Sequence, residues 1–363
     1  LKTSKVRKML DLQNQVEQKG ESGLLGMAIL ENVAISRIYL VYTYLDSNAS
    51  FFERLVRYDY DLVQDTLINE QILIDSIPAA SNHDGSRLVI LNNQVYMTTG
   101  DAGSKPSSQN LNTLAGKVLR VNLDGSIPAD NPIKDSPIYS WGHRNPQGLC
   151  YANNFLYSSE HGPINDDELN IILKGRNYGW PDVPGFCDFP QDSAFCNDSN
   201  VVEPLFAWTP TLAVSDLCYY DHSAIPEWKG SLLMTTLKAS RIVQIKLNAN
   251  KDSVNSTADF FTNNFGRLRA ISIGPGGDVF IATNTNPQQI IRFFNPNVTS
   301  LSELDQEKYQ LTLSPNPASD FLNVKIKELP IKGRIELFSI EGKKLLSERI
   351  SQSEFQLSLT NFD

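Results

Sequence analysis

His83 and Asp101 lie at the two ends of one predicted β-hairpin, and together they could transfer a proton. His83 belongs to the loop SNHDGSRL, and Asp101 ends the segment TTGD. If the strands between them pair through a turn at Asn92-Asn93, the Asp101 carboxylate can accept a hydrogen bond from one ring nitrogen of His83. That contact would fix the imidazole tautomer and leave the other nitrogen free as a general base. Taken alone, the pattern is more typical of a surface histidine with an acid nearby.

A second group of residues could bind a divalent cation. In SEHGPINDDELN, a Gly-Pro dipeptide forces a turn whose carbonyls cannot all pair internally, and three acidic residues follow at once. These residues are Gly162, Pro163, Asp166, Asp167 and Glu168. Carboxylate and carbonyl oxygens at this density suit Ca²⁺, which prefers about six to eight oxygen ligands. The alternative is a solvated acidic turn.

A third group could bind an anion. Arg267 and Arg269 alternate in FGRLRA, so on a strand their side chains share one face. Two guanidinium groups on one face bind an anion well, especially a planar polycarboxylate. Lys238 adds a third cation at the matching place of the preceding predicted hairpin. The alternative is a solvated edge strand.

The elements that must position these groups are predicted to be strands. Several segments share one plan, in which a β-branched or aromatic run, a tight turn of Asn, Gly or Asp, and a second run follow one another. They cover residues 37–45, 87–101, 148–160, 230–247 and 269–284. Long helical periodicity is scarce. Hairpins that recur at roughly sixty-residue intervals favour a β-propeller over an irregular β-sandwich.

The sequence changes character near residue 295. We predict one domain over residues 1–295, a polar linker over 296–309 and a partial small β-sandwich over 310–363. The chain stops in mid-pattern and starts with neither Met nor a signal peptide, so we expect it to be clipped at both ends.

Composition excludes some classes of function. The chain has 363 residues and a formal net charge of -9. A general nucleic-acid binder needs a basic face, so we do not expect nucleic acid as a partner. No apolar run approaches the roughly 20 residues of a membrane helix, so we do not expect the chain to span a membrane.

The four cysteines bear on the redox compartment. Cys187 and Cys196 lie close together in a loop rich in Pro, Asp and Asn. The spacing fits a local disulfide and two free thiols equally well. A disulfide would imply an oxidising compartment. No CxxC pair or Cys/His cluster suggests zinc. Cys150, in an apolar strand, is predicted to be a buried thiol.

Taken in order, the motifs closely resemble those of the soluble glucose/sorbosone dehydrogenases. The matching series is NHDGSRLVI, TTGD, GKVLRVNLDGSIPADNP, GHRNPQGL, SEHGPINDDELNIILKGRNYGWP, LKASRIVQIKL and GRLRAISIGPGGDVF, which covers residues from about 20 to 295. Members of that family are six-bladed β-propellers that use pyrroloquinoline quinone (PQQ). The resemblance implies an all-β fold, with a six-bladed propeller whose N-terminal part lies before Leu1, followed by a truncated small β-sandwich.

The resemblance implies catalytic roles for three residues. His83 would be the general base that takes the proton from the anomeric hydroxyl of a sugar while hydride passes to the quinone. Asp101 would orient His83. Arg144, in GHRNPQG, would stabilise the charge that develops on a quinone oxygen. Pro146 and Gly148 would hold the turn that aims Arg144.

The resemblance also implies cofactor and metal sites. The PQQ contacts would be Asn145, His161, Thr211, Lys238, Arg267 and Arg269. The carbonyls of Gly162 and Pro163 would coordinate a Ca²⁺ that also binds the quinone and polarises it. A second, structural Ca²⁺ site would use Asp167, Glu168, the Tyr178 and Pro184 carbonyls, and Asp188. Glucose-specific members carry Gln where this chain has His161, which indicates the broader aldose sugar dehydrogenase branch.

The C-terminal segment resembles a second family. LSPNPASDFLNVKI followed by IELFSIEGKKLL is similar to the C-terminal sorting domain of type IX secretion in Bacteroidetes-like bacteria. This resemblance implies export through the periplasm to a secreted or cell-surface location, with the type IX secretion machinery as a partner.

The motifs therefore predict a secreted quinoprotein that oxidises an aldose at its anomeric carbon to the lactone. Its cofactors would be PQQ and Ca²⁺, and its electron acceptor is left unidentified. The alternative is a non-catalytic propeller that binds a glycan or a protein partner. A degenerate binder should have lost the base, its orienting acid, the arginines or the calcium loop, and this chain retains them all. A calcium-dependent lactonase would need a carboxylate-lined central metal site, whereas the predicted propeller face offers cations.

Overall fold

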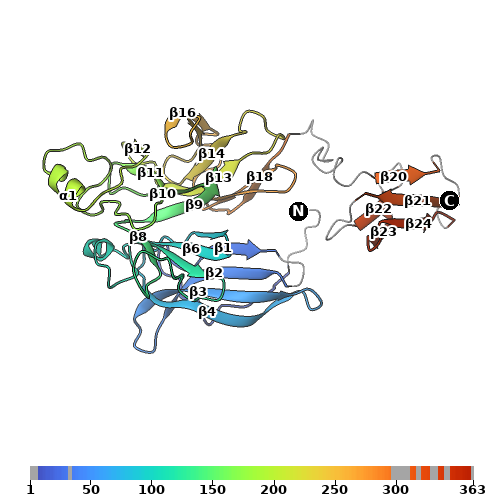
Figure 1. Ribbon diagram of the computed structural model, residues 1–363, viewed down its shortest axis with the longest axis horizontal. Coiled ribbons are helices and arrows are strands. Elements are labelled where there is room, and N and C mark those ends of the chain that lie inside the picture. The colour runs from blue at the N-terminus through green and yellow to red at the C-terminus, as the bar shows by residue number, and fades with distance from the viewer. Residues whose placement is uncertain are drawn as a thin grey trace. The chain divides into compact units, whose positions relative to one another are not determined.

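The computed structural model describes residues 7–31, 35–295, 311–315, 320–327, 334–338 and 344–360. The chain divides into two compact units, Leu1–Asn295 and Pro296–Asp363 (Figure 1). The linker predicted over 296–309 lies outside the described residues. Strands dominate both units, so the predicted all-β fold is confirmed.

The first unit consists of successive antiparallel sheets in which strands adjacent in the chain also pair. The first sheet contains β1 (Leu24–Leu30), β2 (Arg37–Leu45), β3 (Phe51–Asp61) and β4 (Thr66–Pro78). The second contains β5 (Leu88–Leu91), β6 (Gln94–Thr99), β7 (Lys117–Asn122) and β8 (Ile138–Trp141). The third contains β9 (Pro146–Ala152), β10 (Phe155–Glu160), β11 (Asp167–Ile171) and β12 (Phe206–Trp208).

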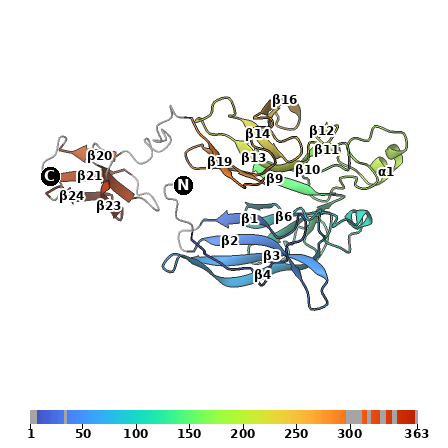
Figure 2. The same ribbon diagram turned by 180° about the vertical axis from the view of Figure 1, so that it is seen from behind.

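Two more sheets complete the described part of this unit. The fourth contains β13 (Val214–Tyr220), β14 (Ser231–Thr236), β15 (Ile242–Leu247) and β16 (Val254–Phe260). The fifth contains β17 (Leu268–Ile273), β18 (Val279–Thr283) and β19 (Ile290–Phe293), and it lies beside the fourth in both views (Figures 1 and 2). The first strands of successive sheets are neighbours, from β1 through β5, β9 and β13 to β17.

Each sheet packs against the next through apolar side chains. Tyr39 and Met97 belong to the cluster that joins the first two sheets, and Tyr157 and Met234 belong to the cluster between the third and fourth. Because a sheet covered on both faces buries successive side chains, β2 is buried continuously from Ile38 to Tyr44. The apolar run RIYLVYTYL therefore reflects burial on both faces of the strand.

The predicted hairpin turns are confirmed. Asn92-Asn93 joins β5 to β6, and Asn153-Asn154 joins β9 to β10. All four asparagines have positive φ, between 51° and 66°. Two consecutive residues of this kind give a tight turn whose twist matches that of paired strands.

The second unit is a small β structure. One sheet contains β20 (Leu311–Ser314), β21 (Phe321–Ile326) and β24 (Glu354–Ser358), and a separate ribbon contains β22 (Arg334–Phe338) and β23 (Lys344–Arg349). Val324, Ile326 and Leu357 form its buried core.

The helical content is small. A short 3₁₀ helix, η1, spans Lys105–Ser108, and α1 spans Asp192–Asp198. Among the described residues, no helix is long and apolar enough to cross a membrane.

Candidate active site

The contact predicted between His83 and Asp101 is present. Nδ1 of His83 lies 2.8 Å from Oδ1 of Asp101. Because an ionised carboxylate can only accept, Nδ1 donates, and Nε2 keeps the free lone pair. Burial alone would raise the pKa of Asp101, but hydrogen bonds from His83, from Nε1 of Trp180 and from the Gly103 amide lower that pKa below its usual value.

Close backbone packing holds the two ends of this hairpin together. The carbonyl of His83 accepts a hydrogen bond from the Ala102 amide at 3.1 Å. A Cβ on Gly100 would lie 1.8 Å from the same carbonyl oxygen, so only glycine fits there. The amide of Asp101 donates to the Arg144 carbonyl at 2.7 Å. The fold thus brings the third predicted catalytic residue to the His-Asp pair.

Arg144 is held by its neighbours on several sides. Its amide donates to Oε1 of Glu160, and its Nη1 donates to the His161 carbonyl at 3.2 Å. Its guanidinium carbon lies 5.3 Å from the centre of the Trp180 ring. Its Nε is buried without a hydrogen-bond partner in the described residues. The side chain therefore retains a buried donor that is unused.

A buried hydrogen-bond network that the sequence did not reveal lies next to Arg144 in the chain. His143 is fully buried, with Nδ1 3.0 Å from Oε2 of Glu160 and Nε2 2.9 Å from Oγ of Ser140. Its ring stacks on Tyr178 with a centroid separation of 4.6 Å. Glu160 is the last residue of β10. A single acid at the end of this strand was the only feature of the sequence that could have indicated a buried carboxylate here.

Asn145 and His161 continue the site from Arg144. The His161 amide donates to the Asn145 carbonyl at 3.2 Å, and Oδ1 of Asn145 accepts from the Gly85 amide at 3.2 Å. Burial, followed by the charge of Arg144, lowers the pKa of His161 to about 3. Its Nε2 is buried without a partner in the described residues, so the ring is neutral and has a polar atom unsatisfied.

A small cavity lies between Arg144 and the acidic loop. Its lining includes Arg144, Glu160, His161, Gly162, Pro163, Asp166, Glu168, Tyr178, Trp180 and Pro184. Burial and then the charge of Glu160 raise the pKa of Glu168. Two crowded carboxyl groups beside free backbone carbonyls favour a cation. No cluster of three or more His, Cys, Asp or Glu side chains occurs over the part of the chain that the structure describes, so backbone oxygens would have to complete a metal site.

Asp167 and Asp188 lie outside the lining of this cavity. Asp167 is buried, and its carboxylate accepts the amides of Gly162 at 2.9 Å and Leu212 at 2.7 Å. These bonds tie the Gly-Pro turn to the chain next to Thr211, whose amide donates to Ile164. Asp188 is exposed.

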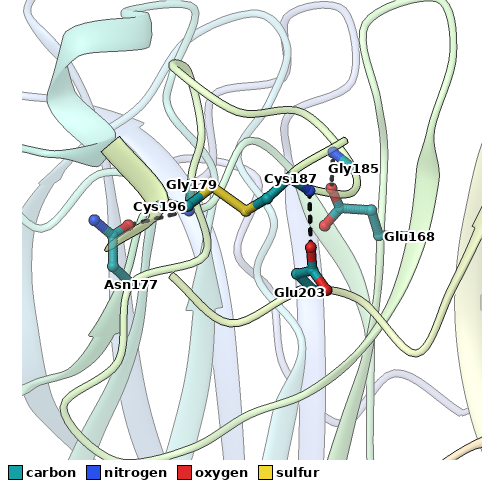
Figure 3. Close-up of a disulfide and its surroundings, with 7 residues drawn as sticks. All are labelled: Glu168, Asn177, Gly179, Gly185, Cys187, Cys196 and Glu203. Atoms are coloured by element: carbon teal, nitrogen blue, oxygen red, sulfur yellow. Dashed lines mark hydrogen bonds between the residues drawn. A yellow bond between two sulfur atoms is a disulfide. The ribbon is translucent and has the colours of Figure 1, made fainter. Parts of the chain in front are cut away.

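The disulfide between Cys187 and Cys196 is formed, which settles the open question about these thiols. Figure 3 shows Cys187 close to Gly185, whose amide donates to Oε1 of Glu168 on β11 at 2.7 Å. The Cys187 amide donates to Glu203 at 2.9 Å. The disulfide and this bond anchor the loop on the far side of the cavity. Cys150 is a free thiol whose pKa burial raises to about 12.

The three predicted cations differ in their surroundings. Nη1 of Arg269 donates to Oε1 of Gln147, and the Arg269 carbonyl accepts from Nη2 of Arg87 at 3.2 Å. Burial, followed by the charge of Arg87, lowers the pKa of Arg269 to about 10, and Arg267 contributes. Lys238 and Arg267 are exposed. Among the described residues, no contact joins the Lys238 side chain to the rest of the site.

Comparison with known proteins identifies the two parts of the chain. The family model described as Glucose / Sorbosone dehydrogenase matches residues 1–292. The model described as Secretion system C-terminal sorting domain matches residues 312–363, which makes this a secreted or cell-surface protein of the type IX pathway.

Individual relatives agree with this assignment. The chain is 32% identical over 352 residues to quinoprotein glucose dehydrogenase B of Acinetobacter calcoaceticus, with 73% of each chain covered. It is 31% identical to an aldose sugar dehydrogenase of Escherichia coli, covering 75% of this chain and 77% of the relative. The PQQ-bound aldose sugar dehydrogenase of Streptomyces coelicolor superposes with a TM-score of 0.65 at 29% identity, covering 77% of this chain and 81% of that one. The relatives of this chain include a quinoprotein glucose dehydrogenase and a PQQ-bound aldose sugar dehydrogenase. The chain therefore belongs to the glucose/sorbosone dehydrogenase family.

Proposed function

We propose that the protein oxidises an aldose at its anomeric carbon to the lactone, with PQQ and Ca²⁺ as cofactors. The observation that carries the proposal is the His83–Asp101 hydrogen bond of 2.8 Å, joined to Arg144 through the Asp101 amide. The Arg144 backbone thus contacts the His83–Asp101 pair, and the Asp101 charge acts on the Arg144 guanidinium. Sugar oxidation needs these three groups, since a proton leaves the hydroxyl while hydride leaves the carbon.

His83 is the general base of this proposal. Its Nδ1 is occupied by Asp101, so Nε2 accepts the proton of the anomeric hydroxyl. Asp101 keeps the ring in that tautomer and stabilises the imidazolium that forms. Since Asp101 is buried and has three donors, its carboxylate stays ionised and in place while His83 changes charge.

The residues around the cavity fit an anionic, planar cofactor. Nε of Arg144 and Nε2 of His161 are both buried and have no partner among the described residues, and such groups call for a ligand. Arg269 is nearby, because its charge contributes to lowering the pKa of His161. We assign cofactor contacts to Arg144, Asn145, His161, Thr211, Lys238, Arg267 and Arg269. When bound, PQQ supplies the carbon that accepts hydride.

The same cavity fits calcium. The turn at Gly162 and Pro163 supplies carbonyl oxygens, and Glu160 and Glu168 supply negative charge. We assign the first calcium to the two carbonyls and the second to Glu168, Tyr178 and Pro184, with Asp167 and Asp188 as further predicted ligands. When bound, calcium supplies a Lewis acid that polarises the quinone.

We further propose that the sheets of the first unit are blades of a six-bladed propeller. Five sheets lie in the described residues, and their first strands are successive neighbours. In a propeller the first strand of each blade lines the centre, which is where His83, Arg144 and Arg269 would converge.

The proposal is tested with the full chain, reconstituted with PQQ and Ca²⁺ and assayed with a panel of aldoses and an artificial dye acceptor. We expect lactone formation on at least one aldose. His83→Ala should lower kcat by at least about a thousandfold, since the variant has no general base for Asp101 to orient. PQQ binding, followed by absorbance, should survive this change.

The matched control is His222→Ala. His222 lies beside Gly277, and its ring nitrogen accepts the nearby Ala224 amide. Among the described residues, no hydrogen bond or ion pair joins it to the proposed site, so activity should stay close to that of the wild type. Bound PQQ without turnover on any aldose would overturn the enzymatic function and favour a binding role.

A further inference from the structure

Trp180 touches both halves of the proposed catalytic group. Its Nε1 donates to Oδ2 of Asp101 at 2.9 Å, and its ring centre lies 5.3 Å from the guanidinium carbon of Arg144. The residue is 6% exposed and lines the cavity. One side chain therefore links the acid that orients His83 to the cation that lies nearby.

The backbone of Trp180 is fixed independently of these contacts. Its amide donates to the Gly142 carbonyl at 3.0 Å, and its carbonyl accepts from Nε2 of Gln109 at 2.7 Å. Gln109 also exchanges hydrogen bonds with the side chain of Asn177. The indole N–H thus comes from a rigid support.

The two oxygens of Asp101 have different partners. Oδ1 accepts from His83 and from the Gly103 amide, each at 2.8 Å. Oδ2 accepts from Trp180, and no other donor reaches it in the described residues. Without the indole N–H, this buried carboxylate would have one oxygen unpaired and would be free to rotate about the bonds to Oδ1.

We propose that Trp180 is a positioning residue for sugar oxidation, which fixes the Asp101 carboxylate and thereby aims Nε2 of His83 at a set place relative to Arg144. This inference rests on the proposed function. Trp180 itself exchanges no proton and touches no reacting atom. It determines where the base points, and its own ring limits where the Arg144 guanidinium can lie.

Loss of the indole N–H has a predictable electrostatic sign. The N–H helps to lower the pKa of Asp101, so its removal makes the carboxylate more basic. A more basic carboxylate stabilises a positively charged imidazolium beside it more strongly. The charged or titratable groups near this pair are Arg144, His161 and the neighbouring Asp84, and Lys105 lies over the Trp180 ring. All four are left unchanged.

The test is Trp180→Phe, which keeps an aromatic ring beneath Arg144 and removes only the donor and part of the ring. We expect the acid limb of the kcat/KM profile to move to higher pH by about one unit. We also expect kcat for the sugar to fall about tenfold, with KM changed much less. Trp228→Phe is the matched control, because Trp228 is buried in the aromatic cluster between the fourth and fifth sheets.

A second measurement uses the unaltered protein without cofactor. The indole N–H signal of Trp180 in an NMR titration should shift as the His83–Asp101 pair changes protonation, whereas that of Trp228 should not. This readout is independent of sugar oxidation, so it stands even if the proposed function fails. The inference is overturned if the acid limb of the kcat/KM profile lies at the same pH in Trp180→Phe as in the wild type. It is also overturned if the chemical shift of the Trp180 indole N–H does not change over the pH range of that limb.

Discussion

At the scale of single residues, the site is defined by polar atoms that lack partners. Nε of Arg144 and Nε2 of His161 are buried and have no partner in the part of the chain that the structure describes, and burial beside Glu160 raises the pKa of Glu168. Buried polar atoms and crowded carboxylates cost free energy in a protein that binds nothing. These residues are therefore better explained by an anionic cofactor and a cation than by stability.

A substitution at Glu168 should separate stability from metal binding. We expect Glu168→Gln to stabilise the calcium-free protein by about 1 kcal/mol above about pH 8, where the Glu168 carboxyl would otherwise be ionised in a buried place beside Glu160. The same change should weaken calcium binding by at least about tenfold, measured by calorimetric titration of the apoprotein. The exposed Glu227→Gln serves as the control. Unchanged calcium affinity would remove Glu168 from the metal site.

At the scale of elements, the contacts between neighbouring sheets carry functional groups as well as apolar side chains. Glu53 on β3 is fully buried, and its Oε2 accepts the hydroxyl of Ser86 at 2.5 Å. Asp84, next to His83, is also buried, and one oxygen of each carboxyl group lacks a partner in the described residues. Burial, followed by the charge of Asp84, raises the pKa of Glu53 well above its usual value.

This buried pair should make stability depend on pH. Burial raises the pKa of Asp84 to about 7, so the folded protein holds protons that the unfolded chain has released. Stability is then fully present below the ordinary carboxyl pKa of about 4 and falls as pH rises to about 7.

Glu53→Gln tests that pair, because the amide can keep the Ser86 bond and donate to Asp84. We expect the variant to be more stable than the wild type by about 2 kcal/mol at pH 8, with the difference vanishing near pH 4. Urea unfolding followed by tryptophan fluorescence reports on the first unit, since all four tryptophans lie there. The exposed Glu31→Gln, directly after β1 of the same sheet, is the control. An advantage that does not change with pH would contradict the explanation that these two buried carboxyl groups hold protons in the folded state.

At the scale of the whole molecule, chemistry and export belong to different units. Every residue assigned to the site lies within Leu1–Asn295, and the sorting domain begins in the second unit. The Cys187–Cys196 disulfide, within the first unit, is consistent with a protein that passes through an oxidising compartment.

Deletion of residues 296–363 should therefore abolish export without changing the chemistry. In a bacterium with type IX secretion, we expect the truncated protein to remain in the periplasm, as measured by cell fractionation. The purified and reconstituted protein should keep the kcat of the full chain within about twofold, since no site contact is removed. Continued appearance of the truncated chain at the cell surface would show that another signal directs export.

The sequence alone determined the features that depend on neighbours along the chain. Asn-Asn turns and alternating strands set the hairpins, and a single hairpin brings His83 to Asp101. The same local reasoning left the Cys187–Cys196 bond open, since spacing shows that two thiols can meet but not that they do. The motif series was sufficient to identify the family, because its order and residue types are specific.

Only the tertiary structure decided which distant residues share a contact. Trp180 meets Asp101 across 79 positions, and Arg269 meets Gln147 across 122. Strand alternation has a period of two and turn preferences extend over about four residues, so neither records which sheet packs on which. Those contacts are set by the packing of separate sheets against one another, and this is why Trp180, Glu160 and Glu53 were found in the structure and not in the sequence.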